Sequence, residues 1–229
     1  MNKRIRIDGV YDHKTIKRLR NISVSDYLFD FRTKSFNFLQ LHRFVEIFKE
    51  IYSPMEKYFL LFENEQDFVV KKILSDLQQQ SNFVDSDGNF NNVFLEFNDE
   101  KEVLYYDSFA VPFYTHFSEN RRLLDLLKSQ YIKGVVFNYS YLEDLHNRGL
   151  FVKFISNFYQ LVYKEINQRK IEIVLCVDWS DDIFPSFMDY LDFDLIAFPI
   201  NAKVEKDYRD VNLDIIEQEL RIQKQNLLS

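Results

Sequence analysis

The feature that most constrains this chain is a repeated alternation of short β-rich runs with longer helical runs. Each β-rich run is dominated by Val, Ile, Leu, Phe or Tyr, and apolar residues between the runs recur at steps of three and four. Helices are predicted at His13–Arg20, Phe38–Ile51, Glu65–Gln80, Arg121–Gln130, Leu150–Gln168, Pro185–Leu191 and Leu213–Gln225. Strands are predicted at Arg4–Val10, Tyr27–Arg32, Tyr58–Glu63, Val93–Phe97, Phe109–Tyr114, Gly134–Tyr139, Glu172–Asp178 and Asp194–Ile200.

Eight such alternations leave two main architectures, a closed β/α barrel and an open doubly wound sheet. The length of 229 residues suits a barrel, since barrels of roughly 200–250 residues fold as one unit. The chain has only four glycines and no glycine-rich phosphate loop, which weakens the open-sheet alternative. The sequence therefore predicts an α/β fold, a single (β/α)8 TIM barrel that forms one domain over residues 1–229.

Charge and cysteine content narrow the possible partners and the compartment. The net charge is −7, and the densest basic cluster, Lys14–Arg20, has the spacing of a solvated helix face. Cys176 is the only cysteine, so no intrachain disulfide can form. The amino terminus does not resemble a signal peptide, and no apolar run approaches the ~20 residues of a membrane span. A cytoplasmic protein with neither a nucleic-acid nor a membrane partner is expected.

Polar residues that alternate with apolar ones along a barrel strand point into the barrel. Arg4, Arg6 and Asp8 share one face of the first predicted strand, and Asp30 and Arg32 share a face of the second. Active sites of β/α barrels lie where the strands end, so these polar residues mark the place where a site is expected. Further polar residues occur in or directly after later strands: Glu63, Asn64, Glu96, Asn138, Asp178 and Asn201.

Inward charges must be paired or solvated, because burying an isolated ion costs several kcal/mol. Arg6 and Arg32 are natural partners for nearby carboxylates, among them Asp8, Asp30, Glu63 and Glu96. Such a cluster is consistent with two arrangements. It could bind a charged small molecule, or it could be an ion network that satisfies itself.

The order of the strands and their residue patterns resemble those of phosphoribosylanthranilate isomerase, a barrel that performs an Amadori rearrangement in tryptophan biosynthesis. The resemblance covers nearly the whole chain and depends more on order and spacing than on identity. Arg4–Tyr11 is similar to the family's first strand, with its K-x-C-G pattern. Four later segments are similar to its second, third, fourth and closing segments: Asp26–Phe38, Tyr58–Asn64, Val93–Asp99 and Asn201–Ile216.

The resemblance implies catalytic positions that have changed in this chain. The family's general base is a cysteine on the first strand, and that position is Asp8. A carboxylate with a raised pKa can also accept a proton, and the related isomerase barrel of histidine synthesis is similar in placing an aspartate there. The family's general acid is an aspartate that ends the sixth strand, and that position is Asn138, whose amide cannot donate a proton in an acid–base cycle. Asp178, one strand further, is a possible substitute.

The implied substrate-binding positions differ as well. The family holds phosphate with glycine-containing loops after strands seven and eight, but here those loops contain no glycine. Lys203 supplies a positive charge in the second loop, while Asp178 would repel phosphate. The arginine expected after the second strand falls near Asn37, with Arg32 close by. Glu96 occupies the place of a histidine on the fourth strand, and Arg6 completes the expected binding residues.

Two hypotheses follow. The first, which the simultaneous changes favour, is a diverged barrel in which the family's aldose–ketose isomerisation is lost or altered. Such a barrel would act as a binding or scaffolding protein, or as an enzyme of another class. The second is an active sugar-phosphate ketol isomerase with Asp8 as its base and Lys203 or Arg32 gripping anions. The expected ligand is a small anionic molecule or sugar phosphate at the barrel mouth. The expected assembly is a monomer or a homodimer.

No cofactor and no metal are expected. The histidines have no metal-site spacing with a carboxylate and are predicted to be surface or capping residues. Trp179 is predicted to lie at the rim or on a lid. The four histidines are His13, His42, His116 and His146.

Overall fold

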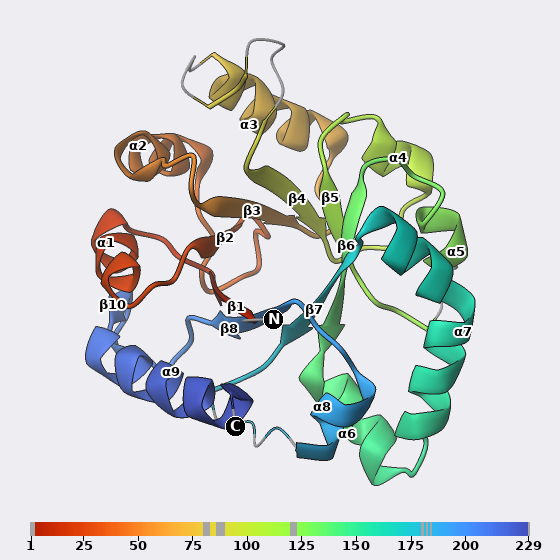
Figure 1. The fold of residues 1–229 in the computed structure, drawn as a ribbon. Coiled ribbons are helices and arrows are strands. Elements are labelled where there is room, and N and C mark those ends of the chain that lie inside the picture. Colours follow the sequence, from red (N-terminus) through yellow and green to blue (C-terminus); the bar gives the residue numbers. More distant parts are fainter. Residues whose placement is uncertain are drawn as a thin grey trace.

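Eight parallel strands close into a barrel in the order β1 to β8, as Figure 1 shows. The computed structural model describes residues 3–79, 83–85, 90–119, 123–179, 181, 183 and 185–228. The closed ring of eight parallel strands confirms the predicted (β/α)8 fold. The strands are β1 (Arg4–Asp8), β2 (Asp26–Asp30), β3 (Lys57–Phe62), β4 (Val93–Phe97), β5 (Phe113–His116), β6 (Ile132–Asn138), β7 (Glu172–Cys176) and β8 (Leu195–Pro199).

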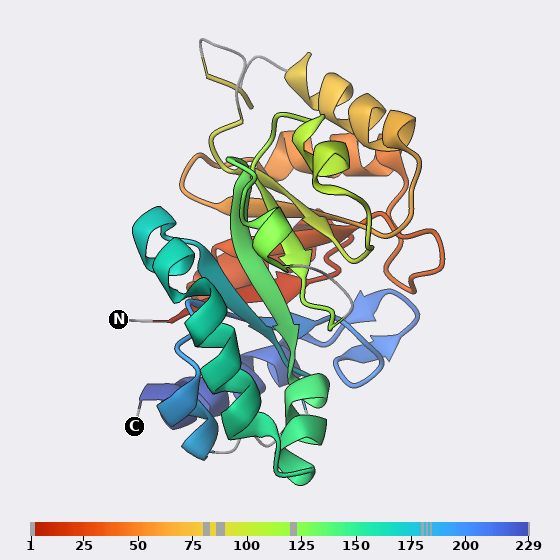
Figure 2. The same cartoon turned by 90° about the vertical axis from the view of Figure 1, so that its right-hand side faces the viewer.

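Helices surround the ring of strands (Figure 1). A two-stranded hairpin follows β8 and lies on the opposite side of the barrel from the two chain ends (Figure 2). Its strands are β9 (Glu205–Asp207) and β10 (Asp210–Val211). The helices are α1 (His13–Asn21), α2 (Leu41–Ile51), α3 (Asp67–Gln78), α4 (Val103–Asp107), α5 (Leu123–Leu126), α6 (Tyr139–Asn147), α7 (Phe151–Arg169), α8 (Pro185–Tyr190) and α9 (Leu213–Leu228).

Alternation along the strands divides the core into two layers. Outward residues pack on helices: Phe29 of β2 and Phe31, directly after β2, meet Phe44 of α2 edge to face, with ring centroids 4.9 and 5.1 Å from that of Phe44. Such aromatic pairs add to the free energy of burying apolar surface. Inward residues fill the barrel, and they include Leu28, Phe59, Leu61, Tyr114, Val136, Val174, Leu195 and Ala197.

The predicted boundaries were wrong around the fifth strand. Phe109–Tyr114 was expected to be extended, but β5 begins at Phe113. Ala110 has a left-handed backbone with φ of 53°, which turns the chain before Pro112. The extended strand therefore cannot run from Phe109 through Ala110 into β5. The run remains apolar because Phe109 and Val111 are buried against the outer core. Helices α4 and α6 were not predicted, and α2 begins at Leu41 rather than Phe38.

Ion pairs close the amino-terminal end of the barrel. Arg4 Nη1 lies 3.1 Å from Oδ2 of Asp26, and its Nη2 lies 2.5 Å from Oε2 of Glu172. Nζ of Lys57 lies 3.3 Å from Oε1 of the same Glu172. The hydroxyl of Tyr114 donates to the same Glu172 at 2.7 Å. Arg4 therefore shares the inward face of β1 with Arg6 and Asp8, as predicted, but it lies at the far end from the expected site.

Among the helices in the described part of the chain, none combines the length and apolar character needed to cross a membrane.

Candidate active site

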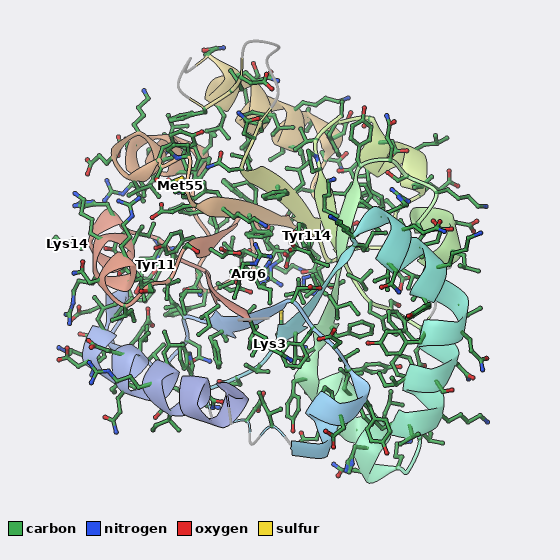
Figure 3. The ribbon with its side chains drawn as sticks, viewed as in Figure 1. Lys3, Arg6, Tyr11, Lys14, Met55 and Tyr114 are labelled. Carbon is green, nitrogen blue, oxygen red and sulfur yellow. The ribbon has the colours of Figure 1, made fainter. Side chains whose placement is uncertain are left out.

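The side chain of Arg6 occupies the middle of the barrel (Figure 3). It is completely buried, and its guanidinium lies 4.6 Å from the centroid of the Phe59 ring. Strand β1 neighbours only β2 and β8 in the barrel, whereas Glu96 is on β4. The Arg6 side chain therefore crosses the interior to reach Glu96, with Nη1–Oε2 of 2.5 Å and Nη2–Oε1 of 3.1 Å.

Arg6 also holds the carboxylate that occupies the predicted base position. Its Nε and Nη2 donate to the two oxygens of Asp8 at 2.6 and 2.9 Å, a bidentate geometry. The Asp8 side chain is 18% exposed, so it reaches solvent, whereas Arg6 and Glu96 do not. One arginine thus serves two carboxylates, Asp8 at the mouth and Glu96 below it.

The two carboxylates have opposite pKa shifts. Burial would raise the pKa of Glu96, but the charges and hydrogen bonds of Arg6 and His116 outweigh it and lower that pKa to about 2. Burial raises the pKa of Asp8 above its usual value, although the Arg6 charge opposes the shift. Glu96 is therefore held as an anion, whereas Asp8 accepts a proton more readily than an ordinary aspartate.

His116, the last residue of β5, is part of this network. Its Nε2 lies 2.9 Å from Oε1 of Glu96, and its side chain is 21% exposed. The prediction that His116 is a surface or capping residue was wrong. The fifth strand was placed too early in the sequence, so His116 fell outside it and its inward direction could not be inferred.

Cys176, the last residue of β7, borders the same group of charges. Burial and the neighbouring carboxylate of Asp8 raise the pKa of its thiol well above the usual value, despite the charge of Arg6. The thiol is therefore neutral and contributes no charge to the network. The titratable groups of this network thus come from β1, β4, β5 and β7.

Arg32 and Asn37, both predicted to bind a ligand, are engaged within the protein. The guanidinium of Arg32 donates to both oxygens of Asp30, at 2.9 and 2.6 Å, and Ser35 donates to the same carboxylate. Asn37 is buried, and its Nδ2 donates to the backbone oxygen of Ile200 at 2.6 Å. Asn37 therefore joins the loop after β2 to the end of β8.

The loops after β7 and β8 are joined by an ion pair. Nζ of Lys203 donates to Oδ2 of Asp178 at 2.9 Å, and Nδ2 of Asn201 donates to Oδ1 at 3.1 Å. Burial alone would raise the pKa of Asp178, but these hydrogen bonds lower it. The positive charge expected to attract phosphate is thus balanced by a carboxylate in the neighbouring loop.

Trp179 was predicted at the rim or on a lid, and that prediction was wrong. Its side chain is buried, its ring stacks on Phe198 with centroids 4.7 Å apart, and Nε1 donates to the backbone oxygen of Pro199. It therefore packs against β8.

Asn138, at the predicted acid position, caps a helix. Its Oδ1 accepts hydrogen bonds from the backbone N–H of Ser140 at 3.2 Å and from the Ser140 hydroxyl at 2.9 Å. This side chain satisfies one of the unpaired donors in the first turn of α6. Asparagine is among the preferred residues at that position, which gives it a structural role that needs no proton transfer.

Several solved structures resemble this barrel over nearly its full length. Phosphoribosylanthranilate isomerase from Thermotoga maritima has a TM-score of 0.63 and 14% identity, covering 97% of this chain and 99% of its own. A phosphoribosylanthranilate isomerase solved with reduced 1-(o-carboxyphenylamino)-1-deoxyribulose 5-phosphate has a TM-score of 0.62 and 14% identity, covering 96% and 97%. This chain has the fold of phosphoribosylanthranilate isomerase. The resemblance noted in the sequence thus extends to three dimensions.

The fold alone does not fix the chemistry. An HpcH/HpaI aldolase from Desulfitobacterium hafniense also matches, with a TM-score of 0.59 and 6% identity, covering 97% of this chain and 93% of its own. No protein-family model matches the sequence. No curated protein matches it either. The activity must therefore be inferred from the residues at the barrel mouth.

The predicted site residues separate into groups. The first unites Arg6, Asp8 and Glu96, and the structure adds His116 to it. Asp178 and Lys203 form a second group. Arg32, Asn37 and Asn138 each bond locally instead: Arg32 to Asp30, Asn37 to Ile200 and Asn138 to Ser140. Among the residues that the structure describes, no three His, Cys, Asp or Glu side chains are arranged to hold a metal ion.

Proposed function

We propose that this chain is a diverged relative of phosphoribosylanthranilate isomerase that keeps a small-molecule site at the barrel mouth and has lost the Amadori rearrangement. The observation that carries the proposal is the pairing of Lys203 with Asp178. A phosphate at these loops would have to displace the carboxylate or lie beside it. Neither loop supplies the glycine that close backbone approach to a phosphate requires.

The acid position supports the same conclusion. Replacing an aspartate by Asn138 removes a group that can exchange a proton, and its amide oxygen is engaged with Ser140. General acid catalysis typically contributes about 10²–10⁴-fold to a rate. We infer that the loss of this acid, together with the loss of glycine from the two loops, leaves phosphoribosylanthranilate weakly bound and without a proton donor.

Asp8 supports a second candidate, an active ketol isomerase. Its carboxylate remains at the end of β1, partly exposed, with a raised pKa that suits a base. This candidate requires an acid other than Asn138 and a phosphate contact that survives the Asp178–Lys203 pair.

Complementation separates the two candidates. We expect that expressing the chain in a bacterial strain without phosphoribosylanthranilate isomerase gives no growth in the absence of tryptophan. Expression of the folded protein is checked in the same cells by immunoblotting of the soluble fraction. Growth that the Asp8→Ala variant abolishes would refute the loss of activity and establish the second candidate.

A further inference from the structure

The network around Arg6 contains a second group able to exchange protons, the imidazole of His116. Glu96 is held as an anion and so can only accept hydrogen bonds, which requires a proton on Nε2 of His116. The other ring nitrogen, Nδ1, then gains or loses the exchangeable proton. A carboxylate that fixes one ring nitrogen in this way sets the orientation and tautomer of a functional histidine.

Asp8 and His116 lie at the carboxyl ends of two strands on opposite sides of the barrel ring. They end β1 and β5, which are four strands apart in the closed ring, and both side chains are partly exposed. Their charges interact, since His116 acts on the carboxylate of Asp8. Arg6 fills the space beneath them and fixes Asp8 and Glu96 through both ends of its guanidinium.

The charges at the mouth argue against an anionic ligand. Arg6, Arg32 and Lys203 each hold at least one carboxylate. Arg32 balances Asp30 and Lys203 balances Asp178, while Arg6 alone serves both Asp8 and Glu96. Each of these three cations already has a carboxylate partner, so a phosphate group would have to displace one of the carboxylates. Hydroxyl and carbonyl groups can instead bond to the carboxylates and the imidazole.

We propose that Asp8 and His116 are the proton-accepting and proton-donating pair of the mouth, acting on an uncharged α-hydroxy carbonyl compound. This proposal rests on the proposed small-molecule site and names its substrate class. Arg6 and Glu96 are positioning residues, because they act by holding Asp8 and His116.

The chemical step balances without a cofactor or co-reactant. Asp8 removes the proton from the carbon next to the carbonyl, and the electrons of that C–H bond form a C=C bond. The carbonyl π electrons take the proton from Nδ1–H of the His116 imidazolium, which gives a neutral enediol. Return of the proton from Asp8 to the other enediol carbon, with the neighbouring hydroxyl proton passing to His116, yields the isomeric carbonyl compound. Opposed carboxylate and imidazole groups are well suited to this transfer.

Deuterium exchange tests the pair without knowledge of the physiological substrate. Purified full-length protein is incubated in D2O with glyceraldehyde, dihydroxyacetone and free pentoses, and loss of the C–H signal is followed by proton NMR. We expect exchange above the protein-free background for at least one compound. His116→Gln and Asp8→Asn should each lower it at least about 100-fold, whereas His42→Gln, on the exposed face of α2, should not change it.

The positioning role of Glu96 has its own readout. Glu96→Gln should shift the pH profile of exchange, because the residue that fixes the His116 tautomer is then uncharged. Circular dichroism shows whether each variant is folded, and Asp8→Asn provides a second variant if His116→Gln does not fold.

Two results would overturn the proposal: wild-type exchange at background for all compounds, or equal exchange by wild type and a folded His116→Gln. Faster exchange with dihydroxyacetone phosphate than with dihydroxyacetone would overturn the assignment to an uncharged substrate. The loss of the Amadori reaction is judged separately by phosphoribosylanthranilate turnover. A protein that exchanges deuterium but does not turn over that compound meets both proposals.

Discussion

The guanidinium of Arg6 on β1 spans the barrel to the carboxylate of Glu96 on β4, and both side chains are completely excluded from solvent. A buried ion pair of this kind is costly to break from one side, because the remaining charge has no water and no counterion. The same guanidinium holds Asp8, so Arg6 fixes the positions of both carboxylates.

Removal of Arg6 should therefore be strongly destabilising. Arg6→Met leaves two inward carboxylates without their shared cation, and breaking a buried pair in this way costs about 3–5 kcal/mol in the free energy of unfolding. Urea unfolding measures the loss. The matched control is Arg43→Met, which removes an arginine exposed on α2 and paired with Glu46, and surface substitutions usually change stability by less than about 0.5 kcal/mol. Equal losses for the two variants would show that Arg6 is not essential to the core.

Glu96 should contribute to acid sensitivity. Its pKa in the folded protein is about 2, below its ordinary value of 4.5. The stabilisation is therefore fully present above pH 4.5 and is lost as pH falls toward 2. Asp8, whose pKa is raised, has the opposite dependence. We expect the stability difference between wild type and Glu96→Gln to shrink steadily over this interval in urea unfolding series. A difference that is independent of pH would mean that the Glu96 charge is not what Arg6 and His116 stabilise.

Gly9 should be irreplaceable for two separate reasons. Its φ is +79°, and a Cβ at this position would lie 2.3 Å from Nδ2 of Asn37. Gly149 also has a positive φ, of +69°, but a Cβ there meets no atom within 4 Å. Each alanine variant incurs backbone strain of about 1–3 kcal/mol, and Gly9→Ala should lose more stability than Gly149→Ala because of the clash.

Thermal unfolding of these two variants and of Gly9→Ala/Asn37→Ala isolates the steric part. Relative to Asn37→Ala alone, the added Gly9→Ala should cost less than it does in the wild type. Identical costs in both backgrounds would show that Asn37 does not confine Gly9.

The carboxylate of Asp178 should govern phosphate affinity with little effect on folding. Asp178→Asn removes the charge that balances Lys203, and a partly exposed ion pair contributes only about 0–1 kcal/mol to stability. Isothermal titration with inorganic phosphate should show tighter binding by the variant than by the wild type. Lys203→Met in the Asp178→Asn background should remove the gain. Unchanged phosphate binding in Asp178→Asn would show that the ion pair is not what excludes the anion.

The fold could be predicted from the sequence because its signals are local. Apolar steps of three and four along α2 and the alternating polarity of β1 each report a periodicity, and eight alternations leave few architectures. The pairing of Arg6 with Asp8 and Glu96 also followed from the need to compensate inward charges. Strand boundaries were harder to predict. The apolar run from Phe109 resembles a strand, but the backbone is left-handed at Ala110, where no glycine in the sequence indicates a turn.

The role of His116 could not be predicted because it depends on that boundary. The structure shows that β5 ends at His116 and that its side chain contacts Glu96, twenty residues earlier in the chain. Without that strand boundary, the inward direction of the His116 side chain could not be inferred. The hydrogen bonds of Asn138 and Asn37 could not be predicted either. Helix α6 was not expected, so nothing in the sequence assigned a capping role to Asn138. The contact of Asn37 with Ile200 links segments 163 residues apart.

The central claim is that the mouth of this barrel is no longer arranged for the Amadori rearrangement. The most direct measurement is the rate at which purified protein converts phosphoribosylanthranilate, followed by the loss of substrate fluorescence at neutral pH. We predict a rate indistinguishable from that of a sample without protein, for the wild type and for Asp8→Ala alike. Saturable turnover by the wild type that Asp8→Ala abolishes would contradict the account.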